Sequence, residues 1–318
     1  MAEIGVALAS EDWGPRELVD LARSAEEAGF EYAFISDHYH PWVDAQGSSP
    51  FVWGVIGGIA EATEHLSLTT GVTCPLIRIH PAIVAQAGAT AACLMPGRFT
   101  LGIGSGENLN EHILGDPWPA ADVRLEMFIE AIEVMRLLWQ GGEQTHRGKH
   151  YTVDHARVYN LPEEPMRLAI AAGAPNAAEI AAEHGDALVN SAPDPEVVEI
   201  FDTKGGSGKP RYGMLHCCWS EDEDEALETA HRLWANIALK GELGRELPRP
   251  ADFEDAVQMV TKEDMAEIVP CGPDPEKHRE HIKRYEDAGY DHVFVHQIGP
   301  EQEGFLRFYA NEILAKVS

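Results

Sequence analysis

Short apolar runs alternate with amphipathic stretches along the whole chain. Eight runs have the length of strands: 4–9, 32–36, 66–73, 99–104, 167–171, 187–190, 211–219 and 292–296. Helical periodicity separates them, at 15–28, 52–64, 81–94, 124–139, 175–184, 194–201, 222–239, 274–288 and 300–317. Eight strands alternating with helices, without an internal linker, predict an α/β protein folded as a single (β/α)8 TIM barrel over residues 1–318.

Two stretches interrupt this alternation. Residues 118–123 and 240–273 are longer than the usual connections between strands and helices, and the second is rich in Glu, Pro and Gly. Insertions at the mouth of a barrel can act as lids. The pattern leaves two interpretations of 240–273 open, a substrate cover and a surface elaboration.

The chain is strongly acidic, with 53 Asp and Glu against 24 Lys and Arg and a net charge of −29. Such a surface repels phosphate backbones and anionic lipids, which argues against nucleic-acid and membrane binding. We expect a cytoplasmic protein, because no apolar run could span a bilayer and the first residues do not resemble a secretion signal. The spread of acidic residues fits either a halophilic protein, whose charges are screened by salt, or an acidic mesophile.

The cysteines do not suggest a disulfide framework or a zinc site. There are five of them, with no C-x-x-C pair: Cys74, Cys93, Cys217, Cys218 and Cys271. We therefore expect no metal site and interpret most of the cysteines as small buried residues.

Polar and aromatic residues follow the first four strands, at the end of a barrel where active sites are built. His38 comes directly after the second strand, beside Asp37 and four residues before Trp42. A lone histidine is most often structural, but this position favours a role in the site. Histidine titrates near neutrality, so it can take the proton of an alcohol during a redox step.

Glycines accompany the fourth strand. Gly104 and Gly106 allow a flat group to lie close to the backbone, and Glu107 follows them. The spacing of Gly102, Gly104 and Gly106 is not a dinucleotide fingerprint, because Glu107 replaces the last glycine and the strand is the fourth of the chain.

The segment Gly173-Ala174-Pro175-Asn176 joins the fifth strand to its helix. The amino terminus of a helix offers amide donors and a favourable dipole to a phosphate. The same residues also suit an ordinary tight turn, and the sequence leaves both interpretations open.

Taken together, these segments resemble the luciferase-like superfamily and, within it, the dehydrogenases that use coenzyme F-420, an 8-hydroxy-5-deazaflavin. The resemblance covers essentially the whole chain and is carried by residues 36–42, 73–75, 80–86 and 104–110. It extends both to glucose-6-phosphate dehydrogenases and to secondary-alcohol dehydrogenases of this group. It implies a (β/α)8 fold, a homodimer and a deazaflavin at the carboxyl-end mouth of the barrel.

The resemblance also implies roles for individual residues. His38 would transfer the proton at the substrate hydroxyl, Trp42 would wall the reaction site, and Glu11 would line the substrate pocket. Glu107 would lie near N1 of the deazaflavin, and Asp37 would contact the cofactor. The other implied cofactor contacts are a non-prolyl cis peptide at Gly71-Val72 and Cys74, Ser105, Gly106, Asn110, Gly173, Ala174, Asn176 and Ala177.

One departure from the family concerns the substrate. An ungapped placement puts Asp194 and Glu267 where sugar-phosphate members carry lysines for the phosphate. Both carboxylates would repel a phosphate, although Arg245 or Arg249 could replace the lysines. An uncharged sugar or a secondary alcohol therefore fits better than glucose 6-phosphate.

The leading hypothesis is a dehydrogenase that passes a hydride from an alcohol or sugar carbon to C5 of the deazaflavin, with His38 as general base. One alternative is an FMN-dependent monooxygenase, which the motif around Asp37 and His38 makes less favourable. Another is a reductase that uses the reduced deazaflavin. A non-catalytic ligand-binding barrel fits less well, because both His38 and Glu107 are present.

Overall fold

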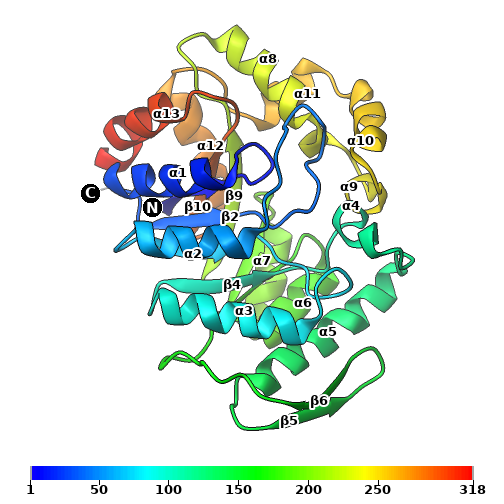
Figure 1. Ribbon diagram of the computed structural model, residues 1–318. Helices are drawn as coiled ribbons and strands as arrows, with labels where there is room; N and C mark the ends of the chain where they lie inside the picture. The colour runs from blue at the N-terminus through cyan, green and yellow to red at the C-terminus, as the bar shows by residue number, and fades with distance from the viewer. Residues whose placement is uncertain (1, 317–318) are drawn as a thin grey trace.

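The computed structural model describes residues 2–316 and contains a closed barrel of parallel strands surrounded by helices (Figure 1). Pairing of the first and last strands closes the barrel, with Glu3 beside His292 and Ala7 beside His296. The strands in their order around the barrel are β1 (Glu3–Leu8), β2 (Tyr32–Ile35), β3 (Ser67–Thr70), β4 (Phe99–Ile103), β7 (Leu168–Ala171), β8 (Ala187–Asn190), β9 (Arg211–Cys217) and β10 (His292–Gln297). The predicted (β/α)8 fold is confirmed, and each predicted strand is present.

Helices alternate with these strands. They are α1 (Pro15–Glu27), α2 (Val52–Ala62), α3 (Pro81–Leu94), α5 (Ala121–Leu138), α6 (Pro175–His184), α7 (Pro195–Phe201), α8 (Glu223–Trp234), α12 (Pro275–Asp287) and α13 (Gln302–Phe308). Several begin with proline, whose fixed φ and missing N–H suit the first helical position. Asp194 caps α7 by accepting hydrogen bonds from the amides of Glu196 and Val197. None of the described helices is long and apolar enough to cross a membrane.

Three predicted boundaries need correction. Helix α5 already begins at Ala121, so the connection predicted at 118–123 is partly helical. The helix predicted over 222–239 ends as α8 at Trp234 and continues as a 3-10 turn, Ala235–Ala238. The helix predicted over 300–317 is divided into α13, a π-helical turn at Tyr309–Ile313 and a 3-10 turn at Leu314–Lys316, and Val317 lies outside the described residues.

The sequence pattern did not predict the hairpin β5 (Gln144–Arg147) and β6 (Thr152–Ala156), or the short helix α4 (Asn108–Glu111). Both hairpin strands are polar and mostly exposed or half-buried, so they lack the apolar run that identified the barrel strands. A 3-10 turn, His112–Leu114, follows α4.

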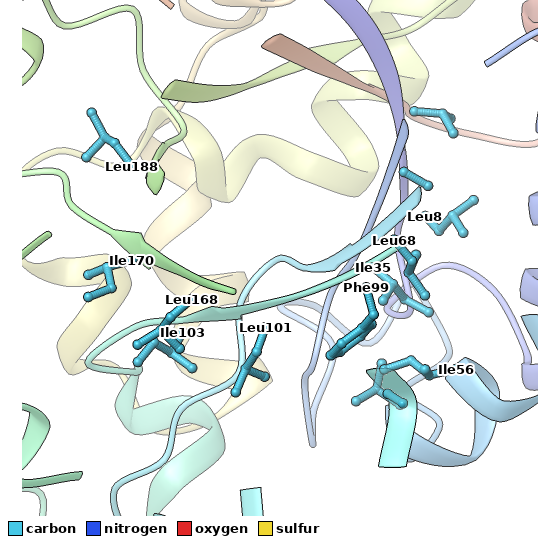
Figure 2. Close-up of a cluster of buried hydrophobic side chains, with 14 of the residues drawn as sticks. Leu8, Ile35, Ile56, Leu68, Phe99, Leu101, Ile103, Leu168, Ile170 and Leu188 are labelled. Carbon is cyan, nitrogen blue, oxygen red and sulfur yellow. The ribbon is translucent and has the colours of Figure 1, made fainter. Parts of the chain in front are cut away.

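Two apolar layers stabilise the barrel. Outward-facing aliphatic side chains pack under the helices, and Figure 2 shows part of this layer, with Ile35, Leu68 and Phe99 near Ile56 of α2, and Leu101 and Leu168 beside Ile103. Inside the barrel, the rings of Phe34 and Phe294 stack with centroids 3.7 Å apart. Side chains alternate between the two faces of each strand, so one apolar strand supplies both layers.

The insertion at 240–273 is folded. It contains α9 (Leu243–Glu246), α10 (Pro250–Ala256), a 3-10 turn (Val257–Met259) and α11 (Lys262–Ile268). Phe253 of α10 is fully buried in a cluster with Val43 and Leu109, which follow β2 and β4. The insertion therefore lies on the loops at the carboxyl ends of the strands, which form the mouth of the barrel (Figure 1).

The cysteines agree with their predicted structural role. Cys74, Cys217, Cys218 and Cys271 are buried and Cys93 is exposed, all as free thiols. Within residues 2–316, no group of His, Cys, Asp and Glu side chains has the arrangement of a metal site.

The close approach of β3 and β4 can be tested at Gly102. A Cβ added there would lie 1.8 Å from the carbonyl oxygen of Thr70, so we expect Gly102→Ala to destabilise the protein by about 1–3 kcal/mol through overpacking. Gly54→Ala is the matched control, because a Cβ there meets nothing within 4 Å; in a helix it should stabilise by about 0.5–1 kcal/mol. Urea unfolding measures both, and equal stability of the two variants would contradict the close approach.

Candidate active site

The loops after β1, β2 and β4 bring three predicted site residues together at the mouth. Nε2 of His38 lies 3.4 Å from Oε1 of Glu11 and 3.9 Å from Oε2 of Glu107. The His38 side chain is 10% exposed and that of Glu107 is 31% exposed. Two carboxylates from different loops therefore face the same ring nitrogen.

Asn110 of α4 fixes the loop that carries His38. Its Oδ1 accepts hydrogen bonds from the amides of Tyr39 (2.8 Å) and His40 (3.3 Å). Its Nδ2 donates to Oε2 of Glu107 at 3.1 Å and lies 3.3 Å from Nδ1 of His38. One amide side chain therefore sets the position of both His38 and Glu107.

Nδ1 of His38 has two neighbours that need opposite protonation states. The amide of Asn110 can only donate to a bare nitrogen, whereas the carbonyl oxygen of His40, at 3.2 Å, can only accept from a protonated one. Either form of Nδ1 therefore finds a hydrogen-bond partner, which suits a histidine that takes up and releases a proton.

Glu11 is 2% exposed and is held by its neighbours. Its Oε2 accepts a 2.5 Å hydrogen bond from the hydroxyl of Ser36, and the same hydroxyl accepts from the amide of Ser10. These bonds fix the carboxylate that faces His38.

Trp42 and the insertion form one wall beside His38. The Trp42 ring lies 4.9 Å from the His38 ring and 5.1 Å from that of Phe253, measured between centroids. Trp42 therefore packs between His38 and Phe253, and its role as a wall of the reaction site stays a prediction.

Arg78, which the sequence pattern did not single out, forms the ionic centre of the mouth. Its Nη2 donates to Oδ1 of Asp37 at 2.9 Å, and its Nε lies 3.5 Å from Oε1 of Glu111. Oδ2 of Asp37 accepts from the hydroxyl of Thr73 at 2.7 Å. Both Asp37 carboxylate oxygens are thus engaged within the protein, and its predicted cofactor contact stays a prediction.

Glu111 is completely buried, and this burial raises the pKa of its carboxyl. Its Oε2 accepts hydrogen bonds from the amides of Ile77 and Arg78, which partly offset the burial. The only signal of this network in the sequence is a single arginine within the otherwise apolar residues 76–79, after the third strand.

The predicted cofactor cradle consists of backbone and small residues. The peptide Gly71-Val72 is cis, as the resemblance implied. A Cβ on Gly104 would lie 2.7 Å from Cγ2 of Val72, and one on Gly106, whose φ is +77°, would lie 2.5 Å from Sγ of Cys74. Ser105 between them is half-buried. The missing side chains at Gly104 and Gly106 thus permit close backbone packing, and they leave no side chain there to obstruct a planar ring.

A second group of predicted cofactor positions lies at the start of α6. Ala174 precedes the helix without a side-chain cap, Gly173 and Asn176 are exposed, and Ala177 is half-buried. Nη2 of Arg245, from α9 of the insertion, lies 3.5 Å from the place a Cβ of Gly173 would take. A guanidinium therefore accompanies the free amides of this turn, and together they could hold an anionic group.

The amino-acid sequence also matches a known protein family. The family model of luciferase-like monooxygenases matches residues 1–292. The chain belongs to the luciferase-like monooxygenase family. It is 34% identical to an F-420-dependent glucose-6-phosphate dehydrogenase of Microbacterium testaceum over 98% of this chain and 96% of that protein. A Nocardia farcinica protein of the same name is also 34% identical, over 99% of this chain and 98% of its own length.

Solved structures agree with the fold. An F-420-dependent secondary alcohol dehydrogenase, in complex with an F-420–acetone adduct, superposes with a TM-score of 0.92 at 28% identity and covers 99% of this chain and 98% of its own. A coenzyme F-420-dependent tetrahydromethanopterin reductase from Methanopyrus kandleri has a TM-score of 0.79 at 23% identity, covering 100% of this chain and 99% of its own. The second likeness concerns the fold alone.

The ionic centre predicts a pH-dependent loss of stability. Arg78→Met leaves Asp37 and Glu111 buried without their cation, so we expect a loss of about 3–5 kcal/mol in unfolding free energy at pH 8. A carboxyl whose pKa is raised in the folded state binds protons there before the unfolded chain does, so folding is favoured as the pH falls. The deficit of the variant should therefore shrink at pH 5.

Urea unfolding at pH 5 and pH 8 measures this effect. Arg23→Met is the matched control, because the pair of Arg23 and Asp20 is exposed and its loss should cost less than about 0.5 kcal/mol at either pH. A deficit of Arg78→Met that grows toward pH 5 would refute the explanation.

Proposed function

We propose that the protein is an F-420-dependent oxidoreductase that acts on a CH–OH group, with hydride transfer between that carbon and C5 of the deazaflavin. The observation that carries the proposal is the position of His38 at the mouth, between Glu11 and Glu107 and with alternative partners for Nδ1. The F-420-dependent dehydrogenases that this chain resembles, at 34% identity in sequence and with a TM-score of 0.92 in structure, support the cofactor and the reaction class.

The residues present fit a deazaflavin. When bound, this group supplies the hydride acceptor. The cis peptide Gly71-Val72, Gly104 and Gly106 offer a flat backbone surface for its ring, beside Ser105. The amides at the start of α6 and the guanidinium of Arg245 offer donors for its anionic tail.

His38 is the proposed general base. Its imidazole accepts the proton of the substrate hydroxyl while the C–H bond is broken, and the carboxylates of Glu11 and Glu107 stabilise the imidazolium. Asn110 keeps Glu107 and the His38 loop in place during this step. Glu107 is the more exposed of the two carboxylates, which suits contact with the cofactor.

We propose an uncharged alcohol or sugar as the substrate. Asp194 serves as the cap of α7, and Glu267 is an exposed residue of α11, so neither supplies the cation that a phosphate needs. Nη2 of Arg249 lies 2.6 Å from Oδ1 of Asp252, so we assign Arg249 a structural role. Arg245 remains near the mouth, beside the turn assigned to the cofactor tail.

A homodimer is proposed as well. Phe51, Ile83 and Leu94, at the ends and surface of α2 and α3, are exposed apolar side chains that a second copy could cover. Light scattering coupled to gel filtration should give twice the 34.9 kDa mass of the chain, and Ile83→Glu should shift it toward the monomer. A monomeric mass for the unaltered protein would contradict the proposal.

Replacement of His38 tests the proposed base. We expect His38→Ala to lower kcat about 10²–10⁴-fold with a secondary alcohol or sugar, because the hydroxyl proton loses its acceptor. The dissociation constant of the deazaflavin should change by less than about threefold, since the variant removes a proton acceptor and leaves the ring's binding surface intact. His65→Ala, at a side chain that is 86% exposed, is the control. Unchanged turnover of His38→Ala would remove His38 from the mechanism.

The cofactor is tested separately by titration. Fluorescence titration with the deazaflavin and with FMN should give binding of the deazaflavin, and binding of FMN alone would favour the monooxygenase alternative. Arg245→Ala should weaken deazaflavin binding by about tenfold, with a smaller loss at high salt because screening already weakens the ion pair.

A further inference from the structure

Two further histidines, His216 and His296, lie at the mouth, outside the site described above. Tyr212 and Met214 of β9 face the barrel interior, and His216 lies two residues further along the same face. His296 lies two residues after Phe294 of β10, and the register pairs it with His216. The stacked ring of Phe294 fills the layer below, so the two imidazoles form part of the floor of the mouth.

These histidines are linked to a carboxylate. Nδ1 of His216 lies 2.9 Å from Nδ1 of His296, and Nε2 of His296 lies 3.5 Å from Oδ2 of Asp12. The same oxygen of Asp12 accepts a 2.9 Å hydrogen bond from Nε1 of Trp234. The Trp234 ring contacts both imidazoles and holds them in place.

The carboxylate determines the tautomers. Nε2 of His296 is buried without a hydrogen bond, and the carboxylate oxygen of Asp12 3.5 Å away favours an N–H there over a lone pair, so Nδ1 of His296 is bare and accepts a hydrogen bond. Nδ1 of His216 must then be the donor, which leaves Nε2 of His216 without a proton. Burial and the neighbouring His296 lower the pKa of His216 well below its usual value, so this imidazole is neutral at pH 7.

The bare nitrogen is free to meet a ligand. Among residues 2–316, Nε2 of His216 has no hydrogen-bond partner, and His216 keeps 9% of its surface exposed. The layer below is filled, so the opening is toward the mouth. This acceptor lies in acidic surroundings, with Asp12 and Glu11 nearby, and therefore favours a neutral donor over an anion.

The two histidine centres share one turn. Glu11 and Asp12 are consecutive residues after β1, and the first faces His38 while the second faces His296. A substrate whose reacting hydroxyl meets His38 therefore lies near the second centre.

We propose that Asp12, His296 and His216 form a relay that presents a bare imidazole nitrogen to a second hydroxyl group of the substrate. The substrate class is then an uncharged polyol, such as a sugar, and His216 determines this specificity. This inference rests on the proposed function, because it assumes that the reacting hydroxyl meets His38. A monohydric alcohol leaves the acceptor unpaired and forfeits this hydrogen bond.

Paired substrates test the specificity. With the deazaflavin as acceptor, the unaltered protein should have a higher kcat/KM for trans-1,2-cyclohexanediol than for cyclohexanol. His216→Phe should lower kcat/KM for the diol by about tenfold or more, mainly through KM, and change that for cyclohexanol by less than about twofold. His216→Gln, which keeps an acceptor oxygen, should restore part of the diol activity. Thermal unfolding of each variant checks that it is folded.

Two results would overturn the inference: the absence of a diol preference in the unaltered protein, or equal losses for both substrates in His216→Phe.

If no alcohol or polyol reduces the deazaflavin, the proposed function fails instead, and a second measurement decides the relay. Nitrogen-15 NMR of histidine-labelled protein, assigned by the signal lost in His216→Phe, should give a bare Nε2 for His216 that the diol perturbs and cyclohexanol does not. A protonated Nε2 in the free protein, or an equal response to both compounds, would refute the relay. Asp12→Asn should shift the tautomer.

Discussion

The guanidinium of Arg78 fixes the geometry of the mouth, because it lies between two buried carboxylates that come from different parts of the barrel. Asp37 follows β2, Arg78 follows β3, and Glu111 belongs to the helix after β4. An unpaired charge at any of these positions would be strongly unfavourable, so the three segments are held at one spacing. His38 is the neighbour of Asp37 in the sequence, and Asn110 is the neighbour of Glu111. The ionic centre therefore helps to set the distances between His38, Asn110 and Glu107.

The acidity of the chain has a local counterpart in the site. The net charge of −29 is mostly carried by exposed carboxylates, whereas Glu11, Asp37 and Glu111 are buried and each has specific hydrogen-bond donors. Carboxylates of this kind can hold a histidine and its proton in place. Exposed ones influence only which ligands approach, and they disfavour anions.

The sequence predicted the barrel well, because most of its strands contain apolar runs, and β4 and β8 are buried along their whole length. It did not predict the hairpin of β5 and β6, because β5 consists of polar residues and Val153 is the one buried residue of the two strands. The roles of Arg78 and His216 depend on partners 41 and 80 residues away, and only the register of the strands brings those partners together. For Asp37, its place in the loop was evident from the sequence, whereas the direction of its carboxylate was not.

The stacked rings of Phe34 and Phe294 bear on the route by which ligands and protons reach the site. They occupy the barrel interior beneath the site, so we expect substrate, product and the proton that the proposed base His38 takes up to pass through the mouth, on the side of the insertion. Exchange of protons with the solvent is then coupled to the same opening that admits the next substrate. A change of the insertion would alter the kinetics of both, even with every residue around His38 unchanged.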